Sequence, residues 1–193
     1  MKVGFLPSWL NPFDVLIIFA LIGGIVWGFL RGVVRMALGL AVLYIATVLA
    51  MTFYELLGER IIYLSGRRLA VGGAELTAFL LILIVTAIVL NFAMNRAFKD
   101  TELPGVRQID QLGGLVLGLL LAVMWIGVIL TGLGFALSTP GFGSDAFRGT
   151  WLGYMHSSLL VPIFFRFLPI AFVTLKPWVP KGQLPGIFTL NPF

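Results

Sequence analysis

The chain has 193 residues, of which 60% are hydrophobic and only 11% are charged, and it carries a formal net charge of +5 without any cysteine. Soluble domains average about 45–50% apolar and about 25% charged residues, so this composition excludes an ordinary soluble globular protein. The missing cysteines exclude disulfides, thiolate metal sites and cysteine nucleophiles.

Four long and nearly charge-free apolar runs dominate the first 137 residues: 13–30, 36–53, 76–94 and 112–137. A helix needs roughly 20 mostly apolar residues to cross a hydrocarbon core about 30 Å thick. We therefore predict an all-α polytopic membrane protein whose four transmembrane helices form one bundle in residues 1–137. We expect residues 138–193 to supply a loop, an interfacial amphipathic segment and a tail of the same domain.

The first run begins with the features of a helix N-terminus. Asn11 is suited to cap the helix, Pro12 fits its first turn, and Asp14 places a carboxylate at the positive end of the helix dipole. No small-x-small cleavage site follows the run, and Arg31 and Arg35 stand where a signal peptide would have its polar region. We therefore expect a retained first helix rather than a cleaved secretory signal.

Only five residues separate the first two runs, so we predict that these helices form a tight antiparallel hairpin. Gly28 and Gly32 supply the backbone freedom for the turn. Arg31 and Arg35 share a face if the helix continues through them. Two interpretations of this pair remain open: headgroup anchoring, or pairing with an acidic residue of a neighbouring helix such as Asp110. Capping at the start of the fourth helix would by itself explain Asp110.

The middle of the chain is predicted to contain two polar connections. Residues 55–73 suggest a surface loop with a short interfacial helix at 61–64, and residues 99–110 suggest a second loop with a Pro-Gly turn. Asn91 lies near the end of the third run. We expect its amide to be buried and to make an interhelical hydrogen bond.

The C-terminal part of the chain differs in composition from the first 137 residues. Residues 138–150 are rich in Gly, Ser and Thr and suggest a loop, whereas residues 159–175 are apolar again. Pro162, Arg166 and Pro169 argue against a fifth spanning helix. A kinked segment in the membrane interface fits better than a re-entrant or spanning segment. Three aromatic residues are its expected anchors: Trp151, Tyr154 and Trp178.

Small residues recur at four-residue steps in two of the runs. The first row is Gly24, Gly28 and Gly32, and the second is Gly114, Gly118 and Ala122. Lipid tails provide no hydrophobic drive for helix association, so close backbone contact through small residues must hold helices together. We interpret the rows as helix-packing faces, although a glycine-lined pore would show the same spacing.

Residues suited to catalysis are sparse. The only histidine, His156, precedes two serines, but its nearest carboxylate, Asp145, lies in a Gly-rich stretch and no third group is evident that would orient the base. Asp14 and Asp110 sit at helix ends rather than in the bilayer interior, which argues against an intramembrane aspartyl protease. One histidine and no cysteine leave no ordinary transition-metal site. We expect no enzymatic activity, cofactor or metal.

Three short motifs follow one another along the chain. The first is an acidic residue that opens a helix and precedes an Arg-Gly-x-x-Arg turn, the second is an Asp with glycines four and eight residues later, and the third is a Trp followed by Ser-x-x-x-Pro. They are carried by Asp14, Arg31, Gly32 and Arg35; by Asp110, Gly114 and Gly118; and by Trp151, Ser158 and Pro162. With the four-helix layout, these motifs resemble the colicin V production protein (CvpA) family of bacterial inner-membrane proteins over about residues 11–170.

The resemblance implies a four-helix inner-membrane protein linked to colicin V production or export and to envelope homeostasis. Three positions depart from the family pattern, because Gln111, Leu121 and Met36 stand where many members have charged residues. A function that relies on that charge set is therefore in question.

Two functional hypotheses follow. In the first, the protein is a non-enzymatic membrane component that works through self-association or other membrane proteins. In the second, it is a small transporter or channel subunit, which would need to form an oligomer because four helices are few for a monomeric pore. The polar residues expected along such a pathway are Arg31, Arg35, Asn91 and Asp110.

The distribution of basic residues indicates a lipid partner but not an orientation. They lie mostly in short loops and the tail, where they anchor a protein to anionic headgroups rather than bind nucleic acid. Four spans place both termini on one side, and the basic residues near span ends divide equally, with five on each side. Some members of the similar family carry a protease domain outside the cytoplasm, which implies that both termini are extracytoplasmic here.

Overall fold

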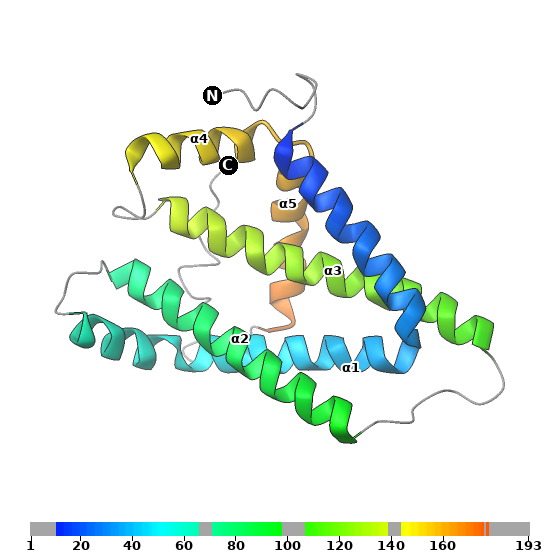
Figure 1. Ribbon diagram of the computed structural model, residues 1–193. Helices are drawn as coiled ribbons and strands as arrows, with labels where there is room; N and C mark the ends of the chain where they lie inside the picture. Colours follow the sequence, from blue (N-terminus) through cyan, green and yellow to red (C-terminus); the bar gives the residue numbers. More distant parts are fainter. Residues whose placement is uncertain (1–10, 66–70, 98–106, 139–143, 176, 178–193) are drawn as a thin grey trace.

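The computed structural model describes residues 11–65, 71–97, 107–138, 144–175 and 177, and its described residues form five helices without a strand (Figure 1). The helices are α1 (Pro12–Leu64), α2 (Val71–Ala97), α3 (Arg107–Ser138), α4 (Asp145–His156) and α5 (Leu160–Val173). By length and composition, three of them could cross a membrane: α1, α2 and α3. The all-α prediction is therefore confirmed for the described residues.

Helix α1 contains the first two predicted runs and changes direction at a single residue. Gly32 has φ 79° and ψ 170°, whereas the residues on either side of it are helical. Glycine adopts this left-handed φ without the steric cost that a Cβ would add. Figure 1 shows the two halves of α1 spreading apart from a corner, which the backbone torsions place at Gly32. The predicted tight hairpin with a five-residue connection is therefore wrong in its form: one residue makes the turn, and the halves diverge.

The second half of α1 also extends beyond the predicted apolar run. Residues 55–64 continue the helix to its cap at Ser65, and α2 already begins at Val71, so most of the predicted 55–73 loop is helical. The extension packs against α2, because a Cβ atom placed on Gly58 would lie 3.4 Å from the Cα of Glu75. The change from apolar to polar sequence after residue 53 therefore does not mark the end of α1, which continues to Leu64.

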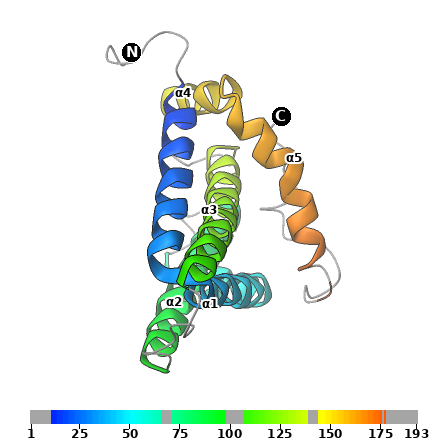
Figure 2. The ribbon, with the colours of Figure 1, turned by 90° about the vertical axis from the view of Figure 1, so that its right-hand side faces the viewer.

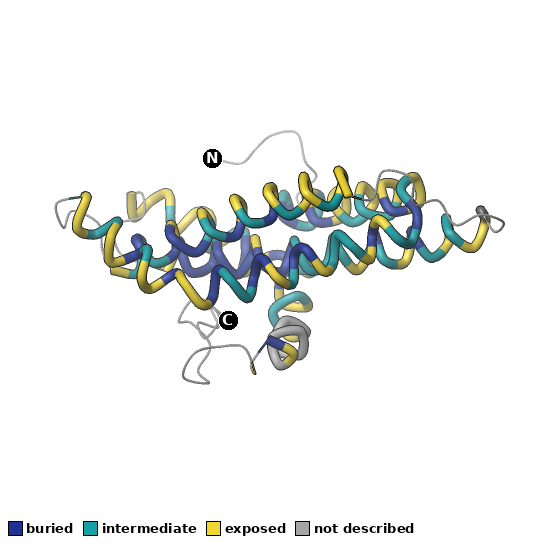
Figure 3. Tube along the Cα trace, turned by 90° about the horizontal axis from the view of Figure 1, so that it is seen from below, coloured by how far each residue is buried: buried dark blue, intermediate teal, exposed yellow. Residues whose placement is uncertain are grey.

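The three long helices share one core and leave an apolar outer surface. Buried residues of α1, α2 and α3 form this core, among them Ala46, Phe79 and Val128. The faces that point outward are also apolar, and Phe19 and Leu30 are 70% and 72% exposed (Figure 3). A large exposed apolar surface is a liability in water, but it matches the hydrocarbon interior of a bilayer.

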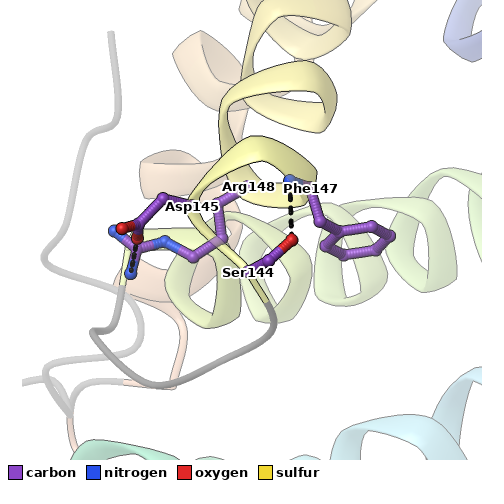
Figure 4. Close-up of polar contacts among 4 residues, drawn as sticks. All are labelled: Ser144, Asp145, Phe147 and Arg148. Carbon is purple, nitrogen blue, oxygen red and sulfur yellow. Dashed lines mark hydrogen bonds and ion pairs between the residues drawn. The ribbon is translucent and has the colours of Figure 1, made fainter.

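Helices α4 and α5 attach to the end of the bundle where α1 begins. Ser144 caps α4 by accepting a hydrogen bond from the Phe147 amide at 3.2 Å (Figure 4). In the first turn of α4, the Arg148 guanidinium forms an ion pair with the Asp145 carboxylate at 3.6 Å. The predicted 138–150 loop is therefore wrong from Asp145 onward. Trp151 packs edge-on against Phe13 of α1 with ring centroids 5.8 Å apart.

Helix α5 lies on the side of α3 opposite the first half of α1 (Figure 2). Its 14 residues span about 21 Å, less than the hydrocarbon core of about 30 Å. Pro162 is the third residue of α5, where a missing amide hydrogen breaks no helical hydrogen bond. The chain then returns to α1, since the Tyr44 hydroxyl donates to the Thr174 carbonyl at 3.0 Å. Trp178, one of the expected anchors, lies outside the described residues.

Candidate functional site: trans-helix caps and an arginine cleft

Two rows of small residues meet where α1 contacts α3. The α1 row is Gly24, Gly28 and Gly32, and the α3 row is Gly114, Gly118 and Ala122. A Cβ atom placed on Gly28 would lie 2.7 Å from the Cα of Gly118. One placed on Gly114 would lie 2.8 Å from the Cα of Gly32. These distances leave no room for a side chain, so the two helix backbones touch directly along the rows.

Asp110 stabilises the corner in α1 from the neighbouring helix. The bend at Gly32 leaves the first amides of the second half of α1 without partners in the preceding turn. The carboxylate of Asp110, in the first turn of α3, accepts a hydrogen bond from the Val33 amide at 3.0 Å. It lies directly over the corner, because a Cβ atom on Gly32 would be 2.8 Å from the Asp110 Cγ. Asp110 therefore caps the second half of α1. The sequence had suggested only that Asp110 caps the helix in which it lies.

Asp14 performs the same role at the start of α5. Its carboxylate accepts hydrogen bonds from the Ser158 hydroxyl at 2.6 Å and from the Leu159 and Leu160 amides at 3.1 and 2.9 Å. The Ser158 oxygen in turn accepts from the Val161 amide at 3.1 Å. Ser158 thus holds its proton toward a carboxylate and its lone pair toward an amide, which is the arrangement of a helix cap.

Asn11 connects the same region to α4. Its side-chain oxygen accepts from the Phe13 amide at 2.9 Å, as expected for the N-cap of α1. Its side-chain nitrogen donates to the Tyr154 carbonyl at 2.7 Å and to the Ser157 hydroxyl at 2.9 Å. Asn11 and Asp14 together fasten the first turn of α1 to the end of α4 and the start of α5. The sequence identified both residues but not their partners, which lie more than 140 positions away.

A cleft of about 420 Å³ lies between both halves of α1, α2 and α3. Four polar side chains contribute to its lining, and we call this feature the arginine cleft: Arg31, Arg35, Asn91 and Asn95. The lining includes no carboxylate from the described residues, and Asp110 is not part of it. Gly24 and Gly118 of the packing rows form part of its wall.

The polar residues of the arginine cleft are accessible rather than buried. The Arg31 guanidinium stacks over the Trp27 ring at 4.3 Å from its centroid. Asn91 is exposed and accepts a hydrogen bond from Asn95, one turn later in the same helix, at 3.3 Å. The prediction of a buried Asn91 with an interhelical hydrogen bond is therefore wrong, because this face of α2 borders the cleft instead of a neighbouring helix.

Sequence reasoning missed Trp27, Trp125 and Asn95 as cleft residues. The signal was present for two of them, because Trp27 lies four residues before Arg31, and Asn95 four residues after Asn91. Among the described residues, no group of three histidine or acidic side chains is placed to share a metal ion.

Long apolar helices, an apolar outer surface and helix ends capped from neighbouring helices define a small multi-pass helical membrane protein. The model of one protein family, described as colicin V production protein, matches residues 13–169. The chain belongs to the colicin V production protein family, and the match spans Asp14, Asp110 and Ser158, which make the caps described above. No curated protein and no solved structure matches the chain.

Proposed function

We propose that the chain is a four-span protein of the bacterial inner membrane that supports colicin V-type toxin production or export and envelope homeostasis without catalysing a reaction. The observation that carries the four-span arrangement is the corner at Gly32 and its cap from Asp110. They divide α1 into two halves that each reach the length of about 20 residues needed to cross a bilayer. With α2 and α3, this makes four spans.

In this arrangement, α4 and α5 lie at the membrane interface beside the start of α1. The length of α5 and the aromatic contacts of Trp151 with Phe13 and Tyr154 support this placement. Both termini are placed outside the cytoplasm, in keeping with the external protease domain that some members of the family carry.

The topology predicts a specific labelling pattern in intact cells. The chain has no cysteine, so Glu59→Cys, Arg96→Cys and Asp145→Cys each introduce a single thiol. We expect a membrane-impermeant maleimide to label the cysteines at 59 and 145 from outside, and the cysteine at 96 only after the membrane is opened. Labelling of positions 59 and 145 from opposite sides would contradict four spans, and the inverse pattern would contradict the orientation alone. The cysteine-free parent is the control.

The proposed role predicts a phenotype in a toxin-producing host. We expect cells that lack the chain to secrete less toxin and to become more sensitive to membrane-active detergents. Expression of the parent chain or of Gly23→Ala should restore both, because a Cβ atom on Gly23 meets nothing within 4 Å. Normal secretion and normal detergent resistance in cells without the chain would contradict the proposal.

A transporter or channel subunit is the second candidate function, and the arginine cleft favours it. The cleft brings together three of the four residues expected along a transport pathway, Arg31, Arg35 and Asn91. An oligomer would be required, because four helices are few for a monomeric pore. In liposomes, solute or ion flux should depend on the four expected pathway residues, which include Asp110 beside the three in the cleft. Flux that Arg31→Ala and Asp110→Ala leave unchanged would therefore exclude this function.

A further inference from the structure

Helix α2 turns one face away from the bundle. It packs mainly against α1 and only slightly against α3. The inward face contains buried residues such as Leu83 and Ala87. On the outward face, Leu81, Ile84 and Ile88 are exposed. This outward face is therefore available to lipid or to another protein.

The exposed residues of this face follow a seven-residue repeat. One row is Thr77, Ile84 and Asn91, and the other is Leu81, Ile88 and Asn95. All six residues are exposed, and we call them together the α2 seam. Along the helix they alternate at steps of four and three residues, which is the a/d pattern of helices that pack in a left-handed coiled coil. Most bundles of transmembrane helices have this crossing geometry. The α2 seam thus has the spacing of a helix-packing face without a partner helix in the described chain.

Two amide side chains lie at one end of the α2 seam. Asn91 falls within the third apolar run, and its side chain accepts a hydrogen bond from Asn95 at 3.3 Å. An asparagine amide has two donor hydrogens and an oxygen with two lone pairs, so both side chains keep the capacity for further hydrogen bonds. Lipid tails offer no partner for such a group, whereas a neighbouring transmembrane helix does. The amides therefore favour a helix over lipid as the occupant of the seam.

The composition of the α2 seam favours an identical helix as that partner. Membrane insertion gives every copy of the chain the same orientation, so two copies related by a two-fold axis place their α2 helices parallel. In such an isologous contact each position near the axis meets its own counterpart. An amide both donates and accepts, so Asn91 can pair with a second Asn91. None of the six residues is charged, so no like charges meet.

We infer that the α2 seam binds the α2 seam of a second copy of this chain, in a parallel dimer in which Asn91 is hydrogen-bonded to its counterpart. The contact lies beside the arginine cleft, because Asn91 and Asn95 also line that cavity. The inference rests on the membrane location in the proposed function and deepens it by naming the partner. It requires neither toxin export nor the proposed orientation, so the labelling pattern at positions 59, 96 and 145 can hold while the dimer fails.

Disulfide cross-linking in native membranes tests the α2 seam, because the chain has no cysteine of its own. Ile84→Cys and Ile88→Cys place a thiol in the seam. Val89→Cys is the matched control, since Val89 is the next residue after Ile88 and is 59% exposed against 63%, but lies outside the seam. After oxidation with copper phenanthroline, we expect both seam variants to form a species of twice the mass of the chain. Val89→Cys should stay monomeric, because a disulfide needs Cα atoms within about 7 Å.

The contribution of Asn91 is measured by energy transfer in liposomes. Full-length chains with Glu59→Cys carry a donor or an acceptor dye, and the signal is followed as the protein is diluted in lipid. We expect Asn91→Leu to weaken dimerisation about three- to thirtyfold, the effect of one interhelical polar contact in a membrane. Asn91→Gln keeps an amide and should lose less, and the control Val89→Leu should lose nothing. Thermal unfolding of each variant checks that the monomer has kept its fold.

Four results would overturn the inference. They are the absence of cross-linking in both seam variants, equal cross-linking at positions 88 and 89, the absence of energy transfer in the parent chain, and unchanged dimerisation in Asn91→Leu. A cross-linked product whose mass is not twice that of the chain would assign the α2 seam to a different protein and would overturn the second copy as its occupant.

Discussion

Replacing Gly28 with alanine is expected to destabilise the α1–α3 contact severely, although it adds only one methyl group. The new Cβ atom would lie 2.7 Å from the Cα of Gly118 and 3.0 Å from the carbonyl carbon of Gly114. Both neighbours are backbone atoms, so no side-chain rotation relieves the clash and the helices must separate. Overpacking typically costs about 1–3 kcal/mol, and the loss of backbone contact along the rows adds to that cost. Thermal unfolding in detergent should show a clearly lowered midpoint.

Gly23→Ala is the matched control, because Gly23 lies in the same helix but outside the contact. Its Cβ atom would meet nothing within 4 Å, and alanine favours a helix over glycine by up to about 1 kcal/mol. We therefore expect Gly23→Ala to be neutral or stabilising. Equal midpoints for Gly28→Ala and Gly23→Ala would show that the rows do not carry the α1–α3 contact.

The helices were the most predictable part of the fold. Long apolar runs have few alternatives to a helix when no water is available to their backbone groups, so the runs at 76–94 and 112–137 anticipate α2 and α3 well. Helix ends were less predictable, because a helix can continue into polar sequence when another helix supports it. Residues 55–64 do so through the approach of Gly58 to α2.

The trans-helix caps could not be deduced from sequence. Asp14 and Asp110 both occupy a first turn, where the dipole of their own helix is a sufficient explanation. Their actual partners, Ser158 and Val33, are 144 and 77 positions away. Only the three-dimensional path of the chain brings these groups together, and a single sequence contains no information on such pairs beyond the presence of suitable donors and acceptors.

The arginine cleft was less predictable than the helices but more predictable than the caps. Arg31, Arg35 and Asn91 were recognised as unusual polar groups near apolar runs, but the sequence did not show that they share one cavity. The cleft lies between the two halves of α1, which diverge at Gly32. This divergence depends on the φ and ψ of that one residue. A tight hairpin, which the sequence suggested, would have brought the two halves of α1 together.

Removing the Asp110 carboxylate is the second change with a large expected effect. Asp110→Ala leaves the partly buried Val33 amide at the corner of α1 without its partner at 3.0 Å. A fully buried donor left unsatisfied costs about 1–3 kcal/mol, which is the upper bound here. We expect a lowered unfolding midpoint and faster hydrogen exchange at the amides that follow Gly32. Asp110→Asn retains an acceptor oxygen and should lose less. Glu59→Ala, which removes an exposed carboxylate, is the control and should change neither measurement.

Gly32→Ala extends this test, because Gly32 and Asp110 occupy the same corner. The substitution combines a φ of 79° and a ψ of 170°, a backbone conformation that is nearly confined to glycine and costs other residues about 1–3 kcal/mol, with a Cβ atom 2.8 Å from the Asp110 Cγ. Asp110→Ala removes the carboxylate from that space, so the double variant should be less destabilised than the sum of the single variants. Residues in direct contact typically couple by about 0.5–3 kcal/mol in such a cycle. Strict additivity would mean that Asp110 does not rest on the corner of α1.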